Sequence, residues 1–423
     1  MNNETPSFSG RPSRTHIALA LLALAGLVLF ILACRPSWSA DGQRVLYSYW
    51  DAGARKVAVA VFDRKTHTSR VIWVGSDAEQ SEAQPVATQW TTDGEQAVIT
   101  IPTDKRTDVE VLPFRSQKPA RRFTFDPLGV DACLPFPQIG SHLFLGNANG
   151  IFRLDLENGE ILEGKLGKEI NDDFGLMPFL IGNQTMYLTE VSAAKPAEAK
   201  KEGENSQKES GELWELGEFN PRDLSFHSIL TLPEAALKEK GVDELTGFFD
   251  GDPKNGRIAI LGRQVETDRM ILLILGRGGV EKVLDAGLKS KEERLGNPQW
   301  SRDAKLIYVA ALLRNAAAQR VELAILEVPL DGKTPRIDRI TEGPKSDFDD
   351  DFLSYAQIAL SPDGKFIALS NGYSEYVRPE KKGIYLLDVS QLSRPVSFYP
   401  APALPAVAKK PVGKTEVKPA AKE

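Results

Sequence analysis

Cysteine and histidine are scarce in this sequence. Its 423 residues include two cysteines, Cys34 and Cys133, and four histidines that never occur in pairs. Two cysteines are too few to provide a disulfide framework. Isolated histidines also argue against a Cys/His metal site or nucleophile. We therefore predict a fold that is held together without disulfides, and we expect no metal and no cofactor.

The sequence motifs of common catalytic sites are missing as well. There is no G-x-S-x-G nucleophile elbow, no H-E-x-x-H, no P-loop and no G-x-G-x-x-G. The glycine-rich stretch 276–279 lacks the following helix that a phosphate cradle needs. The formal charge of −6 is mild, so nothing in it indicates a nucleic-acid partner.

One long apolar run is present, at residues 17–34, and it contains no charged residue. At about 1.5 Å per residue, a run of this length just spans the hydrocarbon core of a bilayer. Arg11 and Arg14 precede it, and positive charge on that side predicts a cytoplasmic leader at residues 1–16 with the bulk of the chain exported. We therefore expect a membrane protein that faces the periplasm or the extracellular side.

Two forms of anchor fit this run, and the sequence leaves both open. One is an uncleaved signal anchor. The other is a lipoprotein signal, because Ile-Leu-Ala-Cys at 31–34 resembles the bacterial lipobox, in which the cysteine is lipidated. Leu32 departs from the small residue that is typical two positions before that cysteine. Cys34 is the lipidation candidate.

A short phrase recurs along the exported part, and each copy is followed by an apolar run. The copies read W-S-A-D-G from Trp38, W-T-T-D-G from Trp90, W-S-R-D-A from Trp300 and L-S-P-D-G from Leu360. Asp-Gly supplies the positive φ of a tight turn between two strands. The units of about 40–50 residues are typical of a propeller or solenoid. We predict an all-β propeller of seven four-stranded blades over residues 36–400, with six or eight blades as alternatives.

The phrase resembles the TolB-type, WD-like β-propeller repeat of bacterial envelope proteins. The resemblance covers the strand pattern at Trp38, Trp90, Trp300 and Leu360. It is weak in the other three units, where we predict first strands at 137–140, 178–180 and around 248–249. It implies a scaffold fold in an envelope compartment and carries no catalytic residue. The recurring tryptophans are predicted to pack between blades.

Other segments do not match the blade pattern. Residues 193–210 are rich in Lys, Glu and Ala and predict a flexible loop between the second and third strands of the fourth blade. Residues 401–423 predict a disordered Pro/Ala/Lys tail, and residues 233–245 a short helix. The acidic run 347–351 could hold Ca²⁺, but we interpret it as a solvated loop. We interpret Asp252 and its neighbours as a turn.

The long connections of this strand assignment all open on one face of the propeller, where propellers usually bind. Aromatic and acidic residues in these connections are our candidate contacts with a protein or envelope partner: Tyr49, Trp50, Asp51, Asp349, Asp350, Tyr373 and Tyr376. The alternatives are a propeller-type hydrolase and a sensor of a small solute in the central channel. The predicted inner strands around Trp38, Trp90, Trp300 and Leu360 carry no charged group, which favours the binding scaffold over the enzyme.

Overall fold

The chain is described by a computed structural model. It covers residues 35–404 with gaps at 52, 76–85, 103–105, 116–117, 126–133, 136–139, 148–149, 165–176, 182–183, 193–211, 316–319, 341–356, 371–381 and 392. The described residues form seven four-stranded antiparallel sheets, and in each sheet the strand order follows the chain. They also contain the helix α2 (Glu234–Lys238).

The sheets are numbered here in chain order. Sheet 1 contains β1 (Ser37–Trp38), β2 (Arg44–Asp51), β3 (Lys56–Asp63) and β4 (Thr68–Val74). Sheet 2 contains β5 (Ala87–Trp90), β6 (Gln96–Pro102), β7 (Thr107–Pro113) and β8 (Arg121–Phe125). Sheet 3 contains β9 (Leu134–Pro135), β10 (His142–Asn147), β11 (Gly150–Asp155) and β12 (Ile161–Gly164). Sheet 4 contains β13 (Met177–Ile181), β14 (Gln184–Ser192), β15 (Glu212–Phe219) and β16 (Phe226–Pro233).

Three more sheets complete the described fold. Sheet 5 contains β17 (Val242–Gly251), β18 (Ile258–Gln264), β19 (Met270–Gly276) and β20 (Gly279–Leu284). Sheet 6 contains β21 (Arg294–Trp300), β22 (Leu306–Asn315), β23 (Arg320–Pro329) and β24 (Arg336–Arg339). Sheet 7 contains β25 (Gln357–Leu360), β26 (Phe366–Ser370), β27 (Gly383–Asp388) and β28 (Val396–Pro400).

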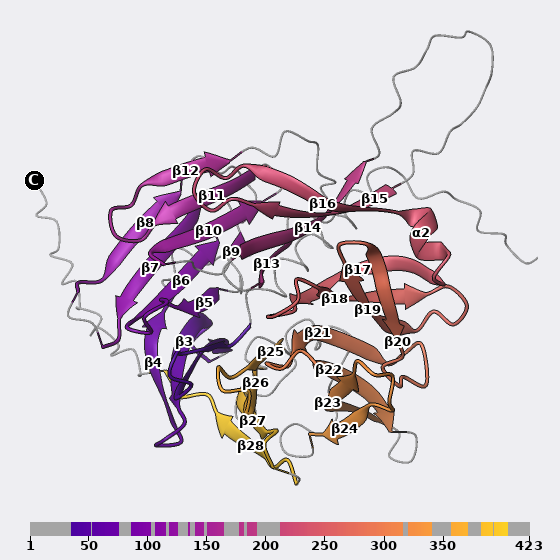
Figure 1. Cartoon of the computed structure of the whole chain (residues 1–423). Helices are drawn as coiled ribbons and strands as arrows, with labels where there is room; N and C mark the ends of the chain where they lie inside the picture. Colours follow the sequence, from indigo (N-terminus) through magenta and orange to yellow (C-terminus); the bar gives the residue numbers. More distant parts are fainter. Residues whose placement is uncertain are drawn as a thin grey trace, which may run out of the picture.

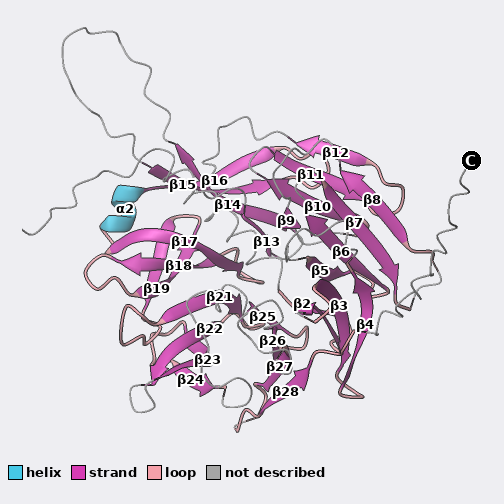
Figure 2. Cartoon of the chain, turned by 180° about the vertical axis from the view of Figure 1, so that it is seen from behind, coloured by secondary structure: helices cyan, strands magenta, loops and turns pink. Residues whose placement is uncertain are grey.

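The sheets are placed radially around a centre, as Figures 1 and 2 show. In Figure 1 first strands such as β5, β9, β21 and β25 lie near the centre, and fourth strands such as β8, β12, β24 and β28 lie at the outside. This is the arrangement of a β-propeller. The prediction of an all-β propeller fold is confirmed.

The core is divided among the interfaces between neighbouring sheets. Strand β2 shows why, because successive side chains of a strand point to opposite faces. Val45 and Tyr47 pack in a cluster with residues of sheet 7, whereas Leu46 packs in a cluster with residues of sheet 2. A strand buried on both faces must be apolar at nearly every position. The apolar runs after the repeated phrase are therefore strands that lie between two neighbouring sheets.

The repeated phrase forms the same turn in each clear copy. The Ser39 hydroxyl donates to Asp41 Oδ1 at 2.6 Å and accepts the amide N–H of Arg44 at 3.0 Å. The corresponding hydroxyls of Thr91, Ser301 and Ser361 donate to their own aspartates at 2.5–2.7 Å. Gly42 has a φ of +64°, as predicted for the Asp-Gly pair.

Each of the three tryptophans of the phrase joins its own sheet to the preceding sheet of the ring. The indole Nε1 of Trp90 donates to the carbonyl oxygen of Ser37 at 3.0 Å, and that of Trp300 donates to Asp250 O at 2.9 Å. Trp38 makes the same bond to Ala359 O, at 2.9 Å. Because Ala359 belongs to β25, this last bond connects sheet 1 to sheet 7. The prediction that these tryptophans pack between blades is confirmed.

Three sequence predictions need correction. The first strand of sheet 3 is β9, upstream of the predicted 137–140, where the phrase is degenerate. The predicted helix at 233–245 is only α2, since Gly241 adopts a φ of +74° and Val242 begins β17. The predicted tail contributes its first residues to the fold, because Ala401 and Leu404 pack against the cluster between sheets 1 and 7.

Candidate functional site

Tyr49 is buried rather than exposed at a contact surface. Its side chain is 2% exposed and packs in the cluster between sheets 1 and 7. The phenol donates to the carbonyl oxygen of Pro402 at 2.7 Å, and burial raises its pKa above the ordinary range for tyrosine. The prediction of Tyr49 as a partner contact is corrected: the β2 alternation directs it inward, where it holds Pro402 against sheet 1.

Replacing Tyr49 by phenylalanine tests this assignment. Only the hydrogen bond to Pro402 is lost, so the free energy of unfolding should fall by about 0.5–1.5 kcal/mol. Denaturant unfolding followed by circular dichroism measures the change. A variant as stable as the parent chain would contradict the bond between Tyr49 and Pro402.

Trp50 and Asp51 lie at the end of β2, where the predicted connection begins. Trp50 is partly buried against the cluster between sheets 1 and 2. Its carbonyl oxygen accepts a hydrogen bond from Lys382 Nζ at 2.9 Å. Asp51 Oδ1 accepts the amide N–H of Ala54 at 2.9 Å. Trp50 therefore helps to join sheets 1 and 7 through its backbone, and Asp51 caps the turn that follows.

The other candidate residues, Asp349, Asp350, Tyr373, Tyr376 and Cys34, lie outside the described residues. The strands on either side are nevertheless informative. Residues 341–356 connect β24 to β25, and 371–381 connect β26 to β27. In a four-stranded blade these two kinds of connection leave the sheets at the same end, which is also the end of β2.

A polar cluster joins the inner strands of sheets 5 and 6. Asp250 on β17 is 9% exposed, and its Oδ2 accepts the amide N–H of Trp300 at 2.8 Å and Gln299 Nε2 at 2.6 Å. The Arg35 guanidinium donates to Gln299 and lies 3.9 Å from Asp250. Residue 35, directly after the predicted anchor, therefore contacts the inner strands of two distant sheets.

The hydrogen bonds of this cluster link sheet 5 to sheet 6. Burial raises the pKa of Asp250, against the opposing effects of the Arg35 charge and the hydrogen bonds from Trp300 and Gln299. Asp250 also shows that an inner strand does carry a charged residue. It could not be recognised in the sequence, because the inner strands were located by the clear copies of the phrase and sheet 5 lacks one.

Asp252 is the second buried carboxylate in this region, at 0% exposure. Arg257 reaches its Oδ2 with Nε at 2.8 Å and Nη2 at 2.7 Å. The amide N–H of Lys254 donates to Oδ1 at 2.8 Å. The interpretation of this segment as a turn is confirmed, since an arginine occupies the position that a cation would need. Within the described parts of the chain, no group of three or more His, Cys, Asp or Glu side chains is arranged to hold a metal ion.

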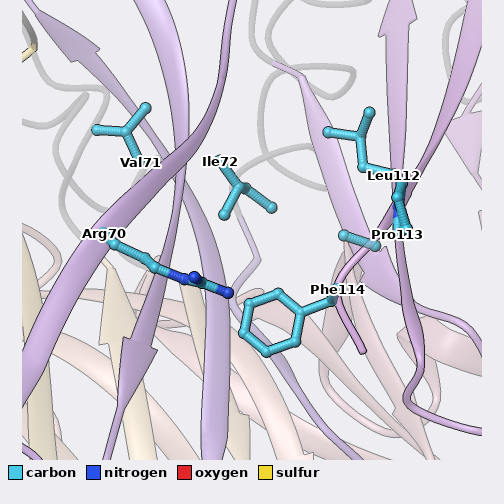
Figure 3. A pocket seen from close by; sticks show the side chains of 7 residues that line it. Arg70, Val71, Ile72, Leu112, Pro113 and Phe114 are labelled. Atoms are coloured by element: carbon cyan, nitrogen blue, oxygen red, sulfur yellow. The ribbon is translucent and has the colours of Figure 1, made fainter. Parts of the chain in front are cut away.

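Two pockets lie between neighbouring sheets. The first, between sheets 1 and 2, has a volume of about 310 Å³ and is shown in Figure 3. It is lined by Arg70, Val71, Ile72, Ala97, Leu112, Pro113 and Phe114. The second, of about 340 Å³, lies between sheets 2 and 3 and is lined by polar residues that include Asp93, Lys118 and Glu157. Neither pocket was predicted, because each is formed by residues of two separate repeats.

No family model matches this chain, and no curated protein matches it. Several solved structures are similar in fold. A chain of the mitotic checkpoint complex has a TM-score of 0.49 at 13% identity, with 81% of this chain and 87% of that chain covered. Oligogalacturonate lyase from Vibrio parahaemolyticus has a TM-score of 0.45 at 9% identity, with 84% of each chain covered. The β-propeller domain of the trilobed protease from Pyrococcus furiosus has a TM-score of 0.41 at 12% identity, with 71% and 79% covered. These likenesses are too distant to assign an activity.

Proposed function

We propose that this chain is a membrane-tethered, extracytoplasmic scaffold: a closed ring of seven blades, of the TolB type, that binds a protein or envelope component through its loop-rich face. The observation that supports a closed ring is the hydrogen bond from Trp38 to Ala359, which joins the first sheet to the last. Two more hydrogen bonds reinforce that junction, one from Lys382 to the Trp50 carbonyl oxygen and one from Tyr49 to the Pro402 carbonyl oxygen. A ring closed in this way presents a rigid frame for the connections at one end of the blades.

The tether in this proposal is residues 17–34, either as a signal anchor or through lipidation of Cys34. No helix in the described ranges, which begin at residue 35, is long and apolar enough to cross a bilayer. Arg35 contacts Asp250 and Gln299, so hardly any linker separates the proposed anchor from the inner strands. The ring is therefore proposed to sit close to the membrane.

The hydrogen bonds of Asp250 favour binding over hydrolysis at the centre of the ring. One of its oxygens already accepts two hydrogen bonds, from Trp300 and Gln299. A general acid or base must be free to reach the reacting atoms. Using Asp250 in that role would require breaking the bonds that join sheets 5 and 6.

Capture from membranes tests both parts of the proposal. The full-length chain should fractionate with membranes and should retain a partner after cross-linking and detergent extraction. Tyr373→Ala combined with Tyr376→Ala should weaken that capture by about 30-fold, as expected for aromatic hot spots worth about 2 kcal/mol or more. Lys65→Ala, an exposed change in the β3–β4 turn at the opposite end of the sheet, should leave capture unchanged.

Two results would count against the proposal. Recovery of the full-length chain in the soluble fraction would reject the tether. Equal capture by the double tyrosine variant and by Lys65→Ala would reject the loop-rich face as the binding surface.

A further inference from the structure

The pocket between sheets 1 and 2 has an apolar floor and a basic rim. Ile72 and Phe114 pack against the cluster that also contains Trp90, and the Phe114 and Trp90 rings meet edge to face with centroids 5.1 Å apart. The Arg70 guanidinium lies 4.4 Å from the centre of the Phe114 ring. Figure 3 shows Arg70 extending toward Phe114, with Ile72 and Leu112 beside them on the two facing strands.

Two more arginines lie next to Phe114, at Arg44 and Arg115, but both are paired with carboxylates. Arg44 lies 3.4 Å from Asp41 and 3.5 Å from Asp63, and Arg115 lies 3.4 Å from Asp41. Arg70 is exposed, and none of the carboxylates in the described ranges lies within ion-pair distance of it. Its positive charge is therefore available to an acidic group from outside.

Strand β4 borders this pocket and is the last strand of sheet 1. It pairs with β3 on one edge, and its other edge has no backbone hydrogen bond to any described residue. Such an edge is a template for an added strand. Arg70, Val71 and Ile72 all line the pocket, and Val71 also packs against the cluster between sheets 1 and 7. A β-bulge at Ile72 shifts the register between β4 and β3, so the regular part of the edge runs from Thr68 to Val71.

We propose that β4 and this pocket bind an extended peptide segment of a partner protein, which adds to the sheet as a further strand. Residues two apart on a strand share a face. An apolar side chain of the segment fills the pocket beside Ile72, and an acidic side chain two positions away pairs with Arg70. The site lies on the flank of the ring and is independent of the loop-rich face.

Synthetic peptides provide the probe. A ten-residue peptide of Thr and Ser carrying Leu and Glu two positions apart is titrated into the full-length chain in detergent micelles, followed by fluorescence anisotropy. We expect saturable binding that is at least about tenfold weaker with Arg70→Glu, because a charge-assisted pair becomes a repulsion. Arg277→Glu, which makes the same charge change at an exposed turn between β19 and β20, should bind like the parent chain.

The peptide controls make the test specific. A peptide with Gln in place of Glu should also bind more weakly, but by less than Arg70→Glu causes, because it loses the ion pair without adding a repulsion. A peptide with Leu and Glu three positions apart should bind weakly, because the two side chains then face opposite sides. Absence of binding at about 1 mM peptide would overturn the proposal. Equal affinity of the Arg70→Glu and Arg277→Glu variants would overturn it too. Binding of a medium-chain fatty acid without binding of any peptide would assign the pocket to small amphiphiles instead.

Discussion

Replacing Trp300 by alanine should lower the free energy of unfolding by about 3–5 kcal/mol, the range for deleting a buried aromatic side chain. Trp300 is 2% exposed within the cluster between sheets 5 and 6. Its indole also donates to Asp250 O, and Arg257 lies 5.1 Å from its ring centre. Alanine would leave a cavity at the point where two blades meet, and an unpaired carbonyl beside it.

Denaturant unfolding followed by circular dichroism measures this loss. Val265→Ala is the control, because Val265 is 51% exposed and its truncation should change stability by no more than about 0.5 kcal/mol. Trp300→Phe should lie between the two, since it keeps most of the packing and loses the indole hydrogen bond. A silent Trp300→Ala variant would mean that the assignment of inside and outside in sheet 6 is wrong.

Replacing Asp252 by alanine should also cost about 3–5 kcal/mol, because it leaves the partly buried Arg257 without its counter-ion. The carboxylate is fully buried and holds Arg257 through two contacts at 2.7–2.8 Å. It also accepts amide N–H groups from Lys254 and Asn255, at 2.8 and 3.2 Å. Removing it therefore releases both the arginine and the turn.

A double-mutant cycle between Asp252→Ala and Trp300→Ala measures how the two sites are coupled. Since Arg257 touches both residues, the combined loss should differ from the sum of the single losses by more than about 0.5 kcal/mol. Asp252→Asn alone leaves the Arg257 cation without its counter-ion. Adding Arg257→Met removes that cation, so the double variant should be more stable than Asp252→Asn alone. Strict additivity would show that Arg257 does not connect Asp252 to Trp300.

The turns and the strands that follow them could be predicted from the sequence alone. A hydroxyl, an aspartate and a glycine within five residues can satisfy one another's hydrogen bonds without help from elsewhere, as Ser39, Asp41 and Gly42 do. The apolar runs that follow were readable as strands because a strand between two sheets is buried on both faces. These two signals were sufficient to predict the all-β propeller and most of its strands.

Other features depended on residues far apart in the chain. Whether Tyr49 faces solvent or the core depends on sheet 7 and on Pro402, 353 positions away. The pairing of Asp250 with Arg35 and Gln299, and the pocket between Arg70 and Phe114, likewise join separate repeats. A repeat pattern reflects the interactions within a single blade, so the turns and strands could be predicted from the sequence alone. Only the packing of one blade against the next decided which polar and aromatic side chains became links and which remained exposed.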